Sequence, residues 1–599
     1  MSLRNRIYLF VAVPLVCILI SGLLLISYHG LPLDPRPSSL GGLTARETTQ
    51  TRTVPEILLL SAEETALVTT VEQTLDEMRI PWAVADRLDS QLLEQVHTVL
   101  VCAGNLPNLE GEAAVTLLDW VESGGYLGLM TSPDGGGWFQ IVGHKLGVID
   151  SGDYWEYHAL RTGQGVLPIY DGLSLDEDLT DYALQVWLEG DCQVFLYTQD
   201  EAETPLLWSR EIGQGRAVVC NHSLISGKDA RGYVLMALQA LEPVLVYPII
   251  NAGMVFIDDF PAPQPEGFDE RIQQQYGVSI QSFYRNHWWP DMKALARSYG
   301  LRYTGVLVET YNQTMHGPFE PDSQDNALIR YYMSELLQSG GEVGLHGYNH
   351  QPLCPAGWQY ADEDYVTWDS PEDMAEAVQE LVRYGNSFLP QTVFTSYVPP
   401  SNYLSAQGQQ VLVDTVPDLQ AISGVYLPEE GVNALVQEFE ENPDGTVSVP
   451  RITSGFSVDS YQKLVTAGEL GLHGVFSHFI HPDDVLDEER GALLGWEQLL
   501  SDLDAALEEI TGAYPALRWC TATQAAAAVQ RYDRVQVKRT WTGSRLTLTL
   551  DQFYDEQWLC LWASEEPDFV EGAEVYPAGN GFWLRAWKDT VVLDWGDGA

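Results

Sequence analysis

Short apolar runs alternate with stretches of helical spacing over residues 55–245. The runs are bounded by polar residues, as in buried strands, and the stretches between them place apolar residues three or four positions apart, as in amphipathic helices. Strands that alternate with helices predict a three-layer α/β domain with a mostly parallel sheet. The predicted strands are 56–61, 98–102, 126–130 and 217–221, and the predicted helices are 64–78 and 113–122.

A second series of apolar runs and helical stretches covers residues 250–530. Seven or eight such repeats are the pattern of a (β/α) barrel, in which functional groups gather where the strands end. The predicted strands are 254–257, 303–308, 343–345, 393–398, 421–426, 447–452, 474–480 and 517–520, and the helices between them include 292–298, 329–337, 374–384 and 496–510.

The last segment, 531–599, changes to an alternation with a period of two, as in 545–550. This pattern predicts a small antiparallel all-β unit. Core packing accounts for most of its tryptophans, and carbohydrate binding is the alternative role. The tryptophans concerned are Trp541, Trp558, Trp562, Trp583, Trp587 and Trp595.

The N-terminal segment 1–30 contains an uncharged apolar run at 7–28, preceded by Arg4 and Arg6. A run of about 20 apolar residues is long enough to cross a bilayer, which predicts a retained signal anchor. The two arginines place the N-terminus in the cytoplasm and the bulk of the chain outside the cell. A cleaved signal peptide is the alternative. Residues 31–54, rich in Pro, Ser, Gly and Thr, are expected to form a linker.

The length of the chain predicts how many domains it has, and its charge excludes one class of partner. A chain of 599 residues is longer than one hydrophobic core usually organises, so we expect two or three folded domains. The formal charge is −53. Because an acidic surface repels phosphate backbones, nucleic acid is not expected to be a partner.

Ligand-type residues follow several strands of the predicted barrel. Asp258 and Asp259 end one strand, and His346 and His350 follow another. Two imidazoles and one carboxylate can hold a borderline divalent metal such as Zn²⁺, and the second carboxylate is left to act as a base. The histidine spacing is not H-E-x-x-H, which excludes a zincin protease. The residues therefore predict metal-assisted hydrolysis.

These residues resemble the motifs of the polysaccharide deacetylases, the NodB-homology enzymes of carbohydrate esterase family 4. The first motif of that family is matched by 256–259, and the second, His-Ser/Thr-x-x-His, is resembled by 346–350. The resemblance implies a deacetylase-type barrel in which Asp259, His346 and His350 hold the metal and Asp258 is the catalytic base.

Two further motifs depart from that family. The third motif contains an arginine that this chain lacks at 397–402, and Arg451 is the candidate to replace it, with a purely structural arginine as the alternative. The late histidine motif is resembled by 475–482, so that either His481 or His478 is expected to be the general acid. The resemblance also makes Pro400, Asn402 and Arg451 candidates for substrate binding.

The first domain resembles the flavodoxin-like and class I glutamine amidotransferase-like proteins, although the turn at 128–133 has no nucleophilic cysteine. We therefore expect it to bind or to act as a scaffold. With the predicted anchor, this architecture resembles the deacetylases of Pel-type exopolysaccharide systems, which implies an N-acetylated amino-sugar polymer as substrate and export components as partners. A non-catalytic export scaffold and a glycoside hydrolase that pairs Asp258 or Asp259 with Glu309 are the alternatives.

Overall fold

The computed structural model describes residues 55–104, 109, 111–163, 169–170, 172–175, 179–319, 326–361, 365–390 and 392–596. They all belong to one compact unit, Ser39–Ala599. The predicted anchor at 7–28 and the linker at 31–54 lie outside the described residues. Every helix in the described part of the chain is too short or too polar to span a lipid bilayer.

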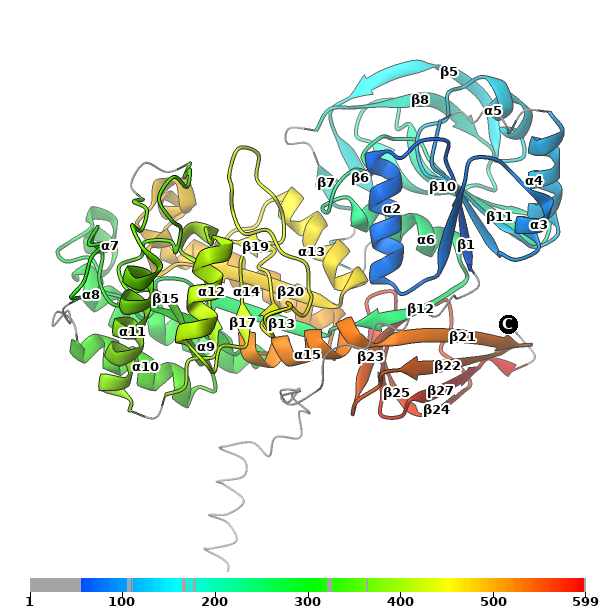
Figure 1. Ribbon diagram of the computed structural model, residues 1–599. Helices are drawn as coiled ribbons and strands as arrows, with labels where there is room; N and C mark the ends of the chain where they lie inside the picture. The colour runs from blue at the N-terminus through cyan, green and yellow to red at the C-terminus, as the bar shows by residue number, and fades with distance from the viewer. Residues whose placement is uncertain are drawn as a thin grey trace, which may run out of the picture. The chain divides into compact units, whose positions relative to one another are not determined.

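A nine-stranded sheet organises the N-terminal part of the described chain (Figure 1). Its strands are β1 (Ile57–Leu60), β2 (Trp82–Ala85), β3 (Thr98–Val101), β4 (Tyr126–Leu129), β6 (Leu160–Thr162), β7 (Ser174–Leu175), β9 (Gln193–Thr198), β10 (Pro205–Ile212) and β11 (Gly215–Cys220). A separate two-stranded sheet consists of β5 (Val148–Tyr157) and β8 (Asp181–Leu188). The helices are α2 (Ala66–Glu77), α3 (Ser90–Leu93), α4 (Glu112–Glu122), α5 (Gly137–Val142) and α6 (Arg231–Leu241).

The strand order of this sheet is β2-β1-β3-β4-β11-β10-β9-β6-β7. Neighbours from β2 to β11 are parallel, and those from β11 to β7 are antiparallel. The prediction of a mostly parallel sheet is therefore right for one half only. The other half is antiparallel because short connections, such as Gly213 and Gln214 between β10 and β11, can only reverse the chain.

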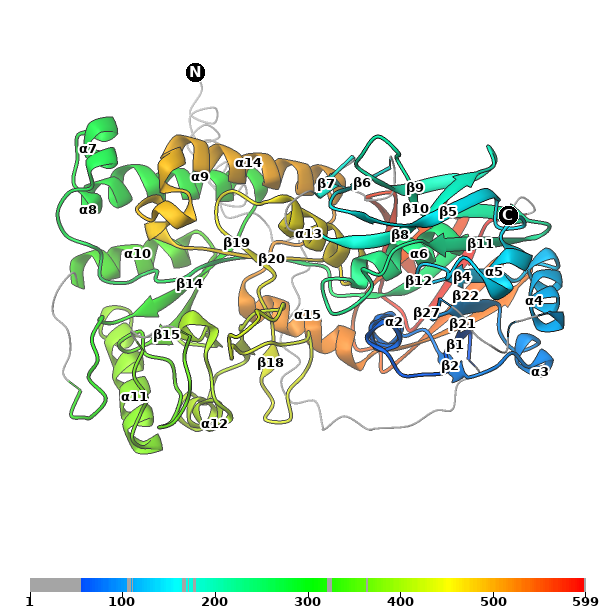
Figure 2. The ribbon, with the colours of Figure 1, turned by 90° about the horizontal axis from the view of Figure 1, so that it is seen from above.

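An eight-stranded parallel sheet follows, in the order β18-β17-β16-β15-β14-β13-β20-β19. Its strands are β13 (Ala252–Ile257), β14 (Tyr303–Val308), β15 (Glu342–Gly347), β16 (Ser396–Tyr397), β17 (Ala421–Ile422), β18 (Val447–Ser448), β19 (Thr453–Ser454) and β20 (Val475–Ile480). It is surrounded by α7 (Glu270–Tyr276), α8 (Ile280–Phe283), α9 (Trp289–Tyr299), α10 (Asn326–Gln338), α11 (Pro371–Phe388), α12 (Ala406–Thr415), α13 (Ser460–Leu472), α14 (Trp496–Ala513) and α15 (Ala522–Arg534), as Figure 2 shows from above. Short helical turns occur at η2 (Tyr284–Trp288), η3 (Pro400–Asn402), η4 (Pro482–Val485), η5 (Glu488–Arg490) and η6 (Ala492–Leu494).

This sheet confirms the α/β class but corrects the continuous barrel. The sheet is open between its edge strands β18 and β19. The sequence predicts a single strand at 447–452, but β18 occupies only the start of this range and β19 begins just after its end. The connection 449–452 spans the opening, where Arg451 N–H donates to Gly424 O and Ile452 N–H to Ser477 O. The predicted strand 517–520 contributes only one bridge, from Trp519 to Gly253.

Two four-stranded antiparallel sheets form the C-terminal unit, in the orders β12-β23-β26-β25 and β21-β22-β27-β24. The strands are β12 (Val244–Ile249), β21 (Gln536–Thr542), β22 (Arg545–Asp551), β23 (Gln557–Ala563), β24 (Phe569–Glu571), β25 (Ala573–Ala578), β26 (Gly581–Ala586) and β27 (Thr590–Asp594). β12 joins this unit from the sequence that precedes the parallel sheet, by pairing with β23.

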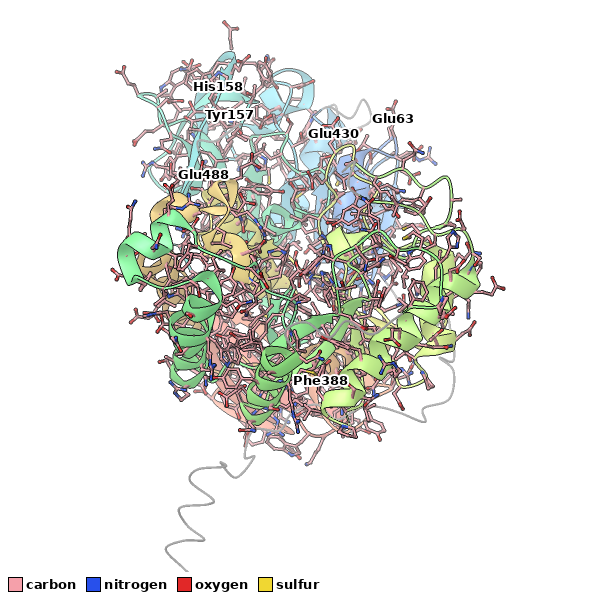
Figure 3. All side chains as sticks on the ribbon, turned by 90° about the vertical axis from the view of Figure 1, so that its left-hand side faces the viewer. Glu63, Tyr157, His158, Phe388, Glu430 and Glu488 are labelled. Atoms are coloured by element: carbon pink, nitrogen blue, oxygen red, sulfur yellow. The ribbon has the colours of Figure 1, made fainter. Side chains whose placement is uncertain are left out.

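Several acidic side chains are exposed at the surface. Figure 3 shows the molecule from the left-hand side of Figure 1, and Glu63, Glu430 and Glu488, which it labels, are all exposed. Charges that lie in solvent, as these do, are screened by salt.

Candidate active site

Two consecutive aspartates follow the fully buried strand β13. Asp258 is 3% exposed, and Asp259 has a φ of 51°. Consecutive residues of a regular strand point to opposite faces of the sheet. Because the backbone of Asp259 leaves the extended conformation, both carboxylates reach the same region beyond the strand end.

The two predicted histidine ligands come from the end of β15 and the turn after it. His346 is buried, and its Nδ1 donates to Val398 O at 2.7 Å, which leaves Nε2 as the lone-pair nitrogen. Gly347 follows with a φ of 135°, and His350 has a φ of 56°. This turn brings the two imidazole rings to a centroid distance of 5.0 Å.

The donor atoms of Asp259, His346 and His350 lie within 4.8 Å of one another. Asp259 Oδ1 is 4.0 Å from His346 Nε2 and 3.5 Å from His350 Nε2. Ligands at 2.0–2.2 Å from a tetrahedral Zn²⁺ would be about 3.4 Å apart, so the three donors are close to the spacing that one ion requires.

The protonation states of these ligands also suit a cation. Burial lowers the pKa of His346 to about 4, so its imidazole is neutral near pH 7. Burial alone would raise the pKa of Asp259, but the neighbouring imidazoles of His350 and His346 bring it below the ordinary value. A neutral imidazole and an ionised carboxylate are the forms that bind metal.

Asp258 is held by Arg451, which is itself 1% exposed. Arg451 also donates to Asn402 Oδ1 and, through Nε, to Gly424 O at 3.3 Å. Although burial raises the pKa of Asp258, the Arg451 charge outweighs it and keeps the pKa below its ordinary value. Asp258 Oδ1 is buried without a hydrogen-bond partner among the described residues, so this oxygen is free to accept a proton at the site.

The two candidate histidines of β20 and the residues after it differ in position. His481 Nε2 is 3.9 Å from Asp258 Oδ2, and its Nδ1 is 3.4 Å from Asp484 Oδ1. His478 instead bonds on both ring nitrogens, with Thr453 Oγ1 at 2.8 Å and Gly455 O at 2.6 Å. His481 therefore lies beside the aspartate pair, whereas the ring of His478 is occupied by β19 and the turn after it.

Charge distinguishes the same two histidines. Despite burial, the hydrogen bond that His481 donates to the Asp484 carboxylate and the charge of Asp258 raise the pKa of His481 to about 9. Burial lowers the pKa of His478 to about 4. At neutral pH His481 carries a proton that it can donate, and His478 does not.

The predicted substrate-binding residues lie at the same end of the sheet but with different contacts. Asn402 Oδ1 accepts from Arg451, so this amide oxygen positions the arginine. Pro400 lies against the backbone of Gly347, where an added Cβ would be 3.4 Å from its Cγ. Neither contact is made to a substrate group, so their role in substrate binding stays a prediction.

Left-handed backbone conformations are concentrated here. Asp259, His350, Ser401 and Asn402 account for four of the nine non-glycine residues with positive φ among the described residues. Each such conformation raises the free energy of the fold by an amount on the order of 1–3 kcal/mol, and they gather at active sites more often than elsewhere.

Three residues of the site were not expected from the sequence. Tyr311 Oη donates to Asp259 Oδ1 at 3.0 Å. Asp484 Oδ2 accepts from the backbone N–H of His481, and Arg490 is 3.0 Å from Asp484 Oδ1. The spacing of Asp484 three residues after His481 is the one available signal, because it places both at the start of η4.

Comparison with known structures supports the fold. Agd3, described as a novel carbohydrate deacetylase, matches with a TM-score of 0.54 and 10% identity over 90% of this chain and 98% of that chain. A carbohydrate esterase family 4 pseudoenzyme from Bacillus anthracis matches with a TM-score of 0.21 and 11% identity, over 42% of this chain and 72% of that chain. The similarity to Agd3 shows a shared α/β fold.

Comparison of the sequence with the curated proteins found no significant match. The model of one protein family, described as an uncharacterised protein conserved in bacteria (DUF2194), matches residues 169–583. The match covers more than half of the chain and includes all the candidate site residues. The chain therefore belongs to the DUF2194 family.

Proposed function

We propose that this protein is a metal-dependent polysaccharide N-deacetylase. The observation that carries the proposal is the convergence of Asp259, His346 and His350 on one point beside a second carboxylate, Asp258, which is held by an arginine. Agd3, a carbohydrate deacetylase that aligns over nearly the full length of both chains, supports the same reaction class.

The proposed roles follow from the contacts. Asp259, His346 and His350 would hold a divalent metal, for which we propose Zn²⁺ because imidazole and carboxylate ligands suit it. The bound metal would polarise the amide carbonyl and acidify water. Asp258 accepts a proton at Oδ1, which has no hydrogen-bond partner among the described residues, while Arg451 fixes its other oxygen. His481 donates its proton to the departing amine, and Asp484 orients the ring.

The finer parts of the proposal concern substrate and location. We propose an N-acetylated amino-sugar polymer, of the kind found in Pel-like exopolysaccharides, as substrate. The chain would be anchored by 7–28 with its bulk outside the cell, and export components are the proposed partners. In this arrangement residues 55–245 bind or position the polymer.

The test combines metal content with acetate release. Protein purified with and without chelator is assayed on N-acetylated amino-sugar oligomers, with Asp259→Ala as the inactive variant and Asp418→Ala, an exposed aspartate, as the matched control. We expect about one metal ion per chain, loss of activity on chelation and recovery with Zn²⁺. Asp259→Ala should lose both metal and activity, and Asp418→Ala neither.

Two other outcomes would support the rivals. A protein that binds polymer but holds no metal and releases no acetate would be a scaffold. Shortening of the polymer without acetate release would indicate a glycoside hydrolase. Glu309, the partner carboxylate that a hydrolase would need, has a side chain that is fully buried, which counts against that reading.

A further inference from the structure

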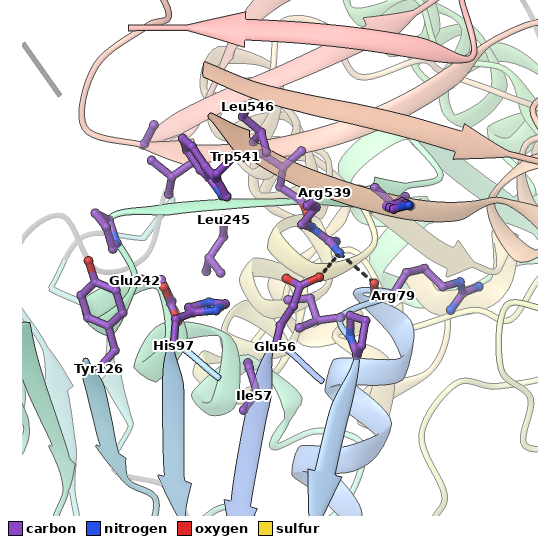
Figure 4. Close-up of a pocket in the computed structure, with 18 of the residues that line it drawn as sticks. Glu56, Ile57, Arg79, His97, Tyr126, Glu242, Leu245, Arg539, Trp541 and Leu546 are labelled. Carbon is purple, nitrogen blue, oxygen red and sulfur yellow. Dashed lines mark hydrogen bonds and ion pairs between the residues drawn. The ribbon is translucent and has the colours of Figure 1, made fainter. Parts of the chain in front are cut away.

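A cleft of about 1670 Å³ lies apart from the metal-ligand cluster, and none of the candidate site residues lines it. One wall consists of the amino ends of β1, β3 and β4, marked by Glu56, His97 and Tyr126 in Figure 4. Trp541 on β21 faces this wall, and Leu245 on β12 lies between the two. Pockets for small molecules are typically about 300–1,000 Å³, so this cleft has room for a segment of a polymer.

The wall of the cleft that carries Trp541 presents a fixed aromatic surface. Trp541 is 50% exposed, although tryptophan is among the residues that proteins bury most. Its ring stacks on Trp595, with centroids 6.0 Å apart and an interplanar angle of 26°. Trp595 is in turn held by a hydrogen bond from Nε1 to Glu565 O at 3.1 Å. The exposed indole is thus a preformed flat surface.

The opposite wall presents hydrogen-bonding groups. His97 is half exposed, and its Nε2 is 3.5 Å from Glu242 Oε1. Glu242 is itself buried, 3% exposed, and also accepts from Thr98 Oγ1. A flat apolar surface facing fixed polar groups matches a pyranose ring, which has an apolar C–H face and a rim of hydroxyl groups.

The charges along the cleft determine whether an anionic, neutral or cationic polymer can bind there. Arg539 donates to Val246 O at 2.8 Å and Arg79 O at 2.9 Å and lies 3.7 Å from Glu56, so its charge is already matched by the protein. Among the other charged lining residues, the carboxylates outnumber the cations: Asp76, Asp551, Glu565 and Asp568 against Arg79 and Lys538. An anionic polymer would meet this negative potential at close range, whereas a neutral or amine-bearing one would not.

We propose that this cleft is a second, non-catalytic binding site for a neutral or amine-bearing polysaccharide, in which a sugar ring stacks on Trp541. The proposal goes beyond the deacetylase reaction, because binding here does not require the metal site to be active. A polymer held at two places on one chain would gain avidity over a single site.

The test measures binding in protein that carries Asp259→Ala, so that turnover cannot alter the probe. The probes are immobilised oligomers of N-acetylated amino sugars, free amino sugars, neutral hexoses and uronic acids. Trp541→Ala is compared with Trp587→Ala, which removes another tryptophan of the same unit that is 45% exposed but does not line the cleft. Trp541→Phe keeps an aromatic face, and thermal unfolding confirms that each variant is folded.

We expect at least one neutral or amino-sugar oligomer to bind, and Trp541→Ala to weaken that binding about tenfold or more. Trp587→Ala should bind as the parent does, Trp541→Phe should lie between, and uronic acid oligomers should not bind. The proposal is overturned if no neutral or amino-sugar oligomer binds, or if folded Trp541→Ala binds as well as Trp587→Ala. Acetate release by the unmodified protein is measured separately, so failure here leaves the proposed reaction independently testable.

Discussion

The ion pair between Asp258 and Arg451 is the most buried charge interaction of the site, since the two side chains are 5% and 1% exposed. A buried ion pair has little net effect on stability when complete, but the loss of one partner leaves an uncompensated charge that destabilises by about 3–5 kcal/mol. The pair also fixes the carboxylate geometry, because Arg451 is held by Asn402 and Gly424.

Arg451→Lys should therefore impair catalysis more than metal binding. Lysine keeps the charge but cannot bond Asp258, Asn402 and Gly424 together, because it lacks the planar fork. We expect kcat for acetate release to fall by about 10- to 100-fold with metal content unchanged, since Asp259 and the two histidines are untouched. Steady-state kinetics together with metal analysis would check this, and a parallel loss of metal would contradict it.

His481→Gln and His478→Gln form a matched pair of substitutions three residues apart, His478 in β20 and His481 directly after it. Because His481 lies beside Asp258 and carries a proton at neutral pH, His481→Gln should lower kcat by about 10²- to 10⁴-fold in stable protein. His478 bonds Thr453 and Gly455, so His478→Gln should lower the unfolding midpoint instead. Acetate release per folded molecule distinguishes the two, and the reverse ranking would refute the assignment.

At the scale of elements, the connection 449–452 explains how Arg451 reaches the site. It runs between the edge strands β18 and β19, and its backbone bonds to residues 424 and 426 on one side and Ser477 on the other. Gly424 O accepts from both the backbone N–H and Nε of Arg451. A side chain at 424 is excluded from the other side, because an added Cβ would lie 2.3 Å from Leu435 O.

Gly424→Ala should consequently destabilise the protein and displace Arg451. The clash is with backbone, which cannot turn away, so we expect a loss of about 1–3 kcal/mol in the free energy of unfolding and reduced kcat. Gly512→Ala is the control, since nothing lies within 4 Å of its added Cβ in α14, and helix propensity should raise stability by about 0.5–1 kcal/mol. Urea unfolding measures both, and equal effects of the two substitutions would contradict the interpretation.

The local sequence pattern was sufficient to predict the strands that carry the site, but not to predict how strands pair at the edges of the sheets. The strand predicted at 303–308 coincides with β14, and the strands before Asp258 and His346 are extended by a few residues at most. Apolar runs reveal strands because burial on both faces demands them. The break at 449–452 and the pairing of β12 with β23 depend on partners distant in sequence, which no local period encodes.

The same limit applies to the site. The convergence of Asp259, His346 and His350 could be predicted because they lie at or just after strand ends, whereas Tyr311 and Arg490 lie in connections without a periodic pattern. The choice between His478 and His481 required the three-dimensional structure, since both belong to the same apolar run and only their partners differ.

At the scale of the whole molecule, one buried cluster joins the first sheet's helices to the parallel-sheet region. His473, which follows α13, is 2.6 Å from Glu469 and 3.4 Å from Glu77 at the end of α2. Tyr532 on α15 donates to the Glu77 carbonyl at 3.0 Å. The helices α2, α13 and α15, which are far apart in sequence, are thus connected through the His473 imidazole, the Glu77 and Glu469 side chains and the Tyr532 hydroxyl.

The cluster makes the free energy of unfolding depend on pH on both the acidic and the alkaline side of neutrality. Although burial opposes it, Glu469 and Glu77 raise the pKa of His473 from 6.5 to about 9, so its contribution is complete below about pH 6.5 and is lost as pH rises through 9. Burial alone would raise the pKa of Glu77, but His473 lowers it from 4.5 to about 2, so that contribution is present above about pH 4.5 and is lost as pH falls toward 2. Between these limits the cluster contributes fully.

His473→Gln isolates the alkaline part of this dependence from the general repulsion of a chain with 84 acidic residues. A shift from 6.5 to about 9 corresponds to about 3 kcal/mol, so the variant should be less stable than the unmodified protein by roughly that amount at pH 6. Above pH 10 the histidine is neutral in both states, and the difference should shrink toward the value of a lost neutral hydrogen bond, about 1 kcal/mol. Urea unfolding at the two pH values measures the difference directly, because the repulsion common to both proteins cancels. A difference that stays constant from pH 6 to pH 10 would show that His473 is not charged in the folded protein.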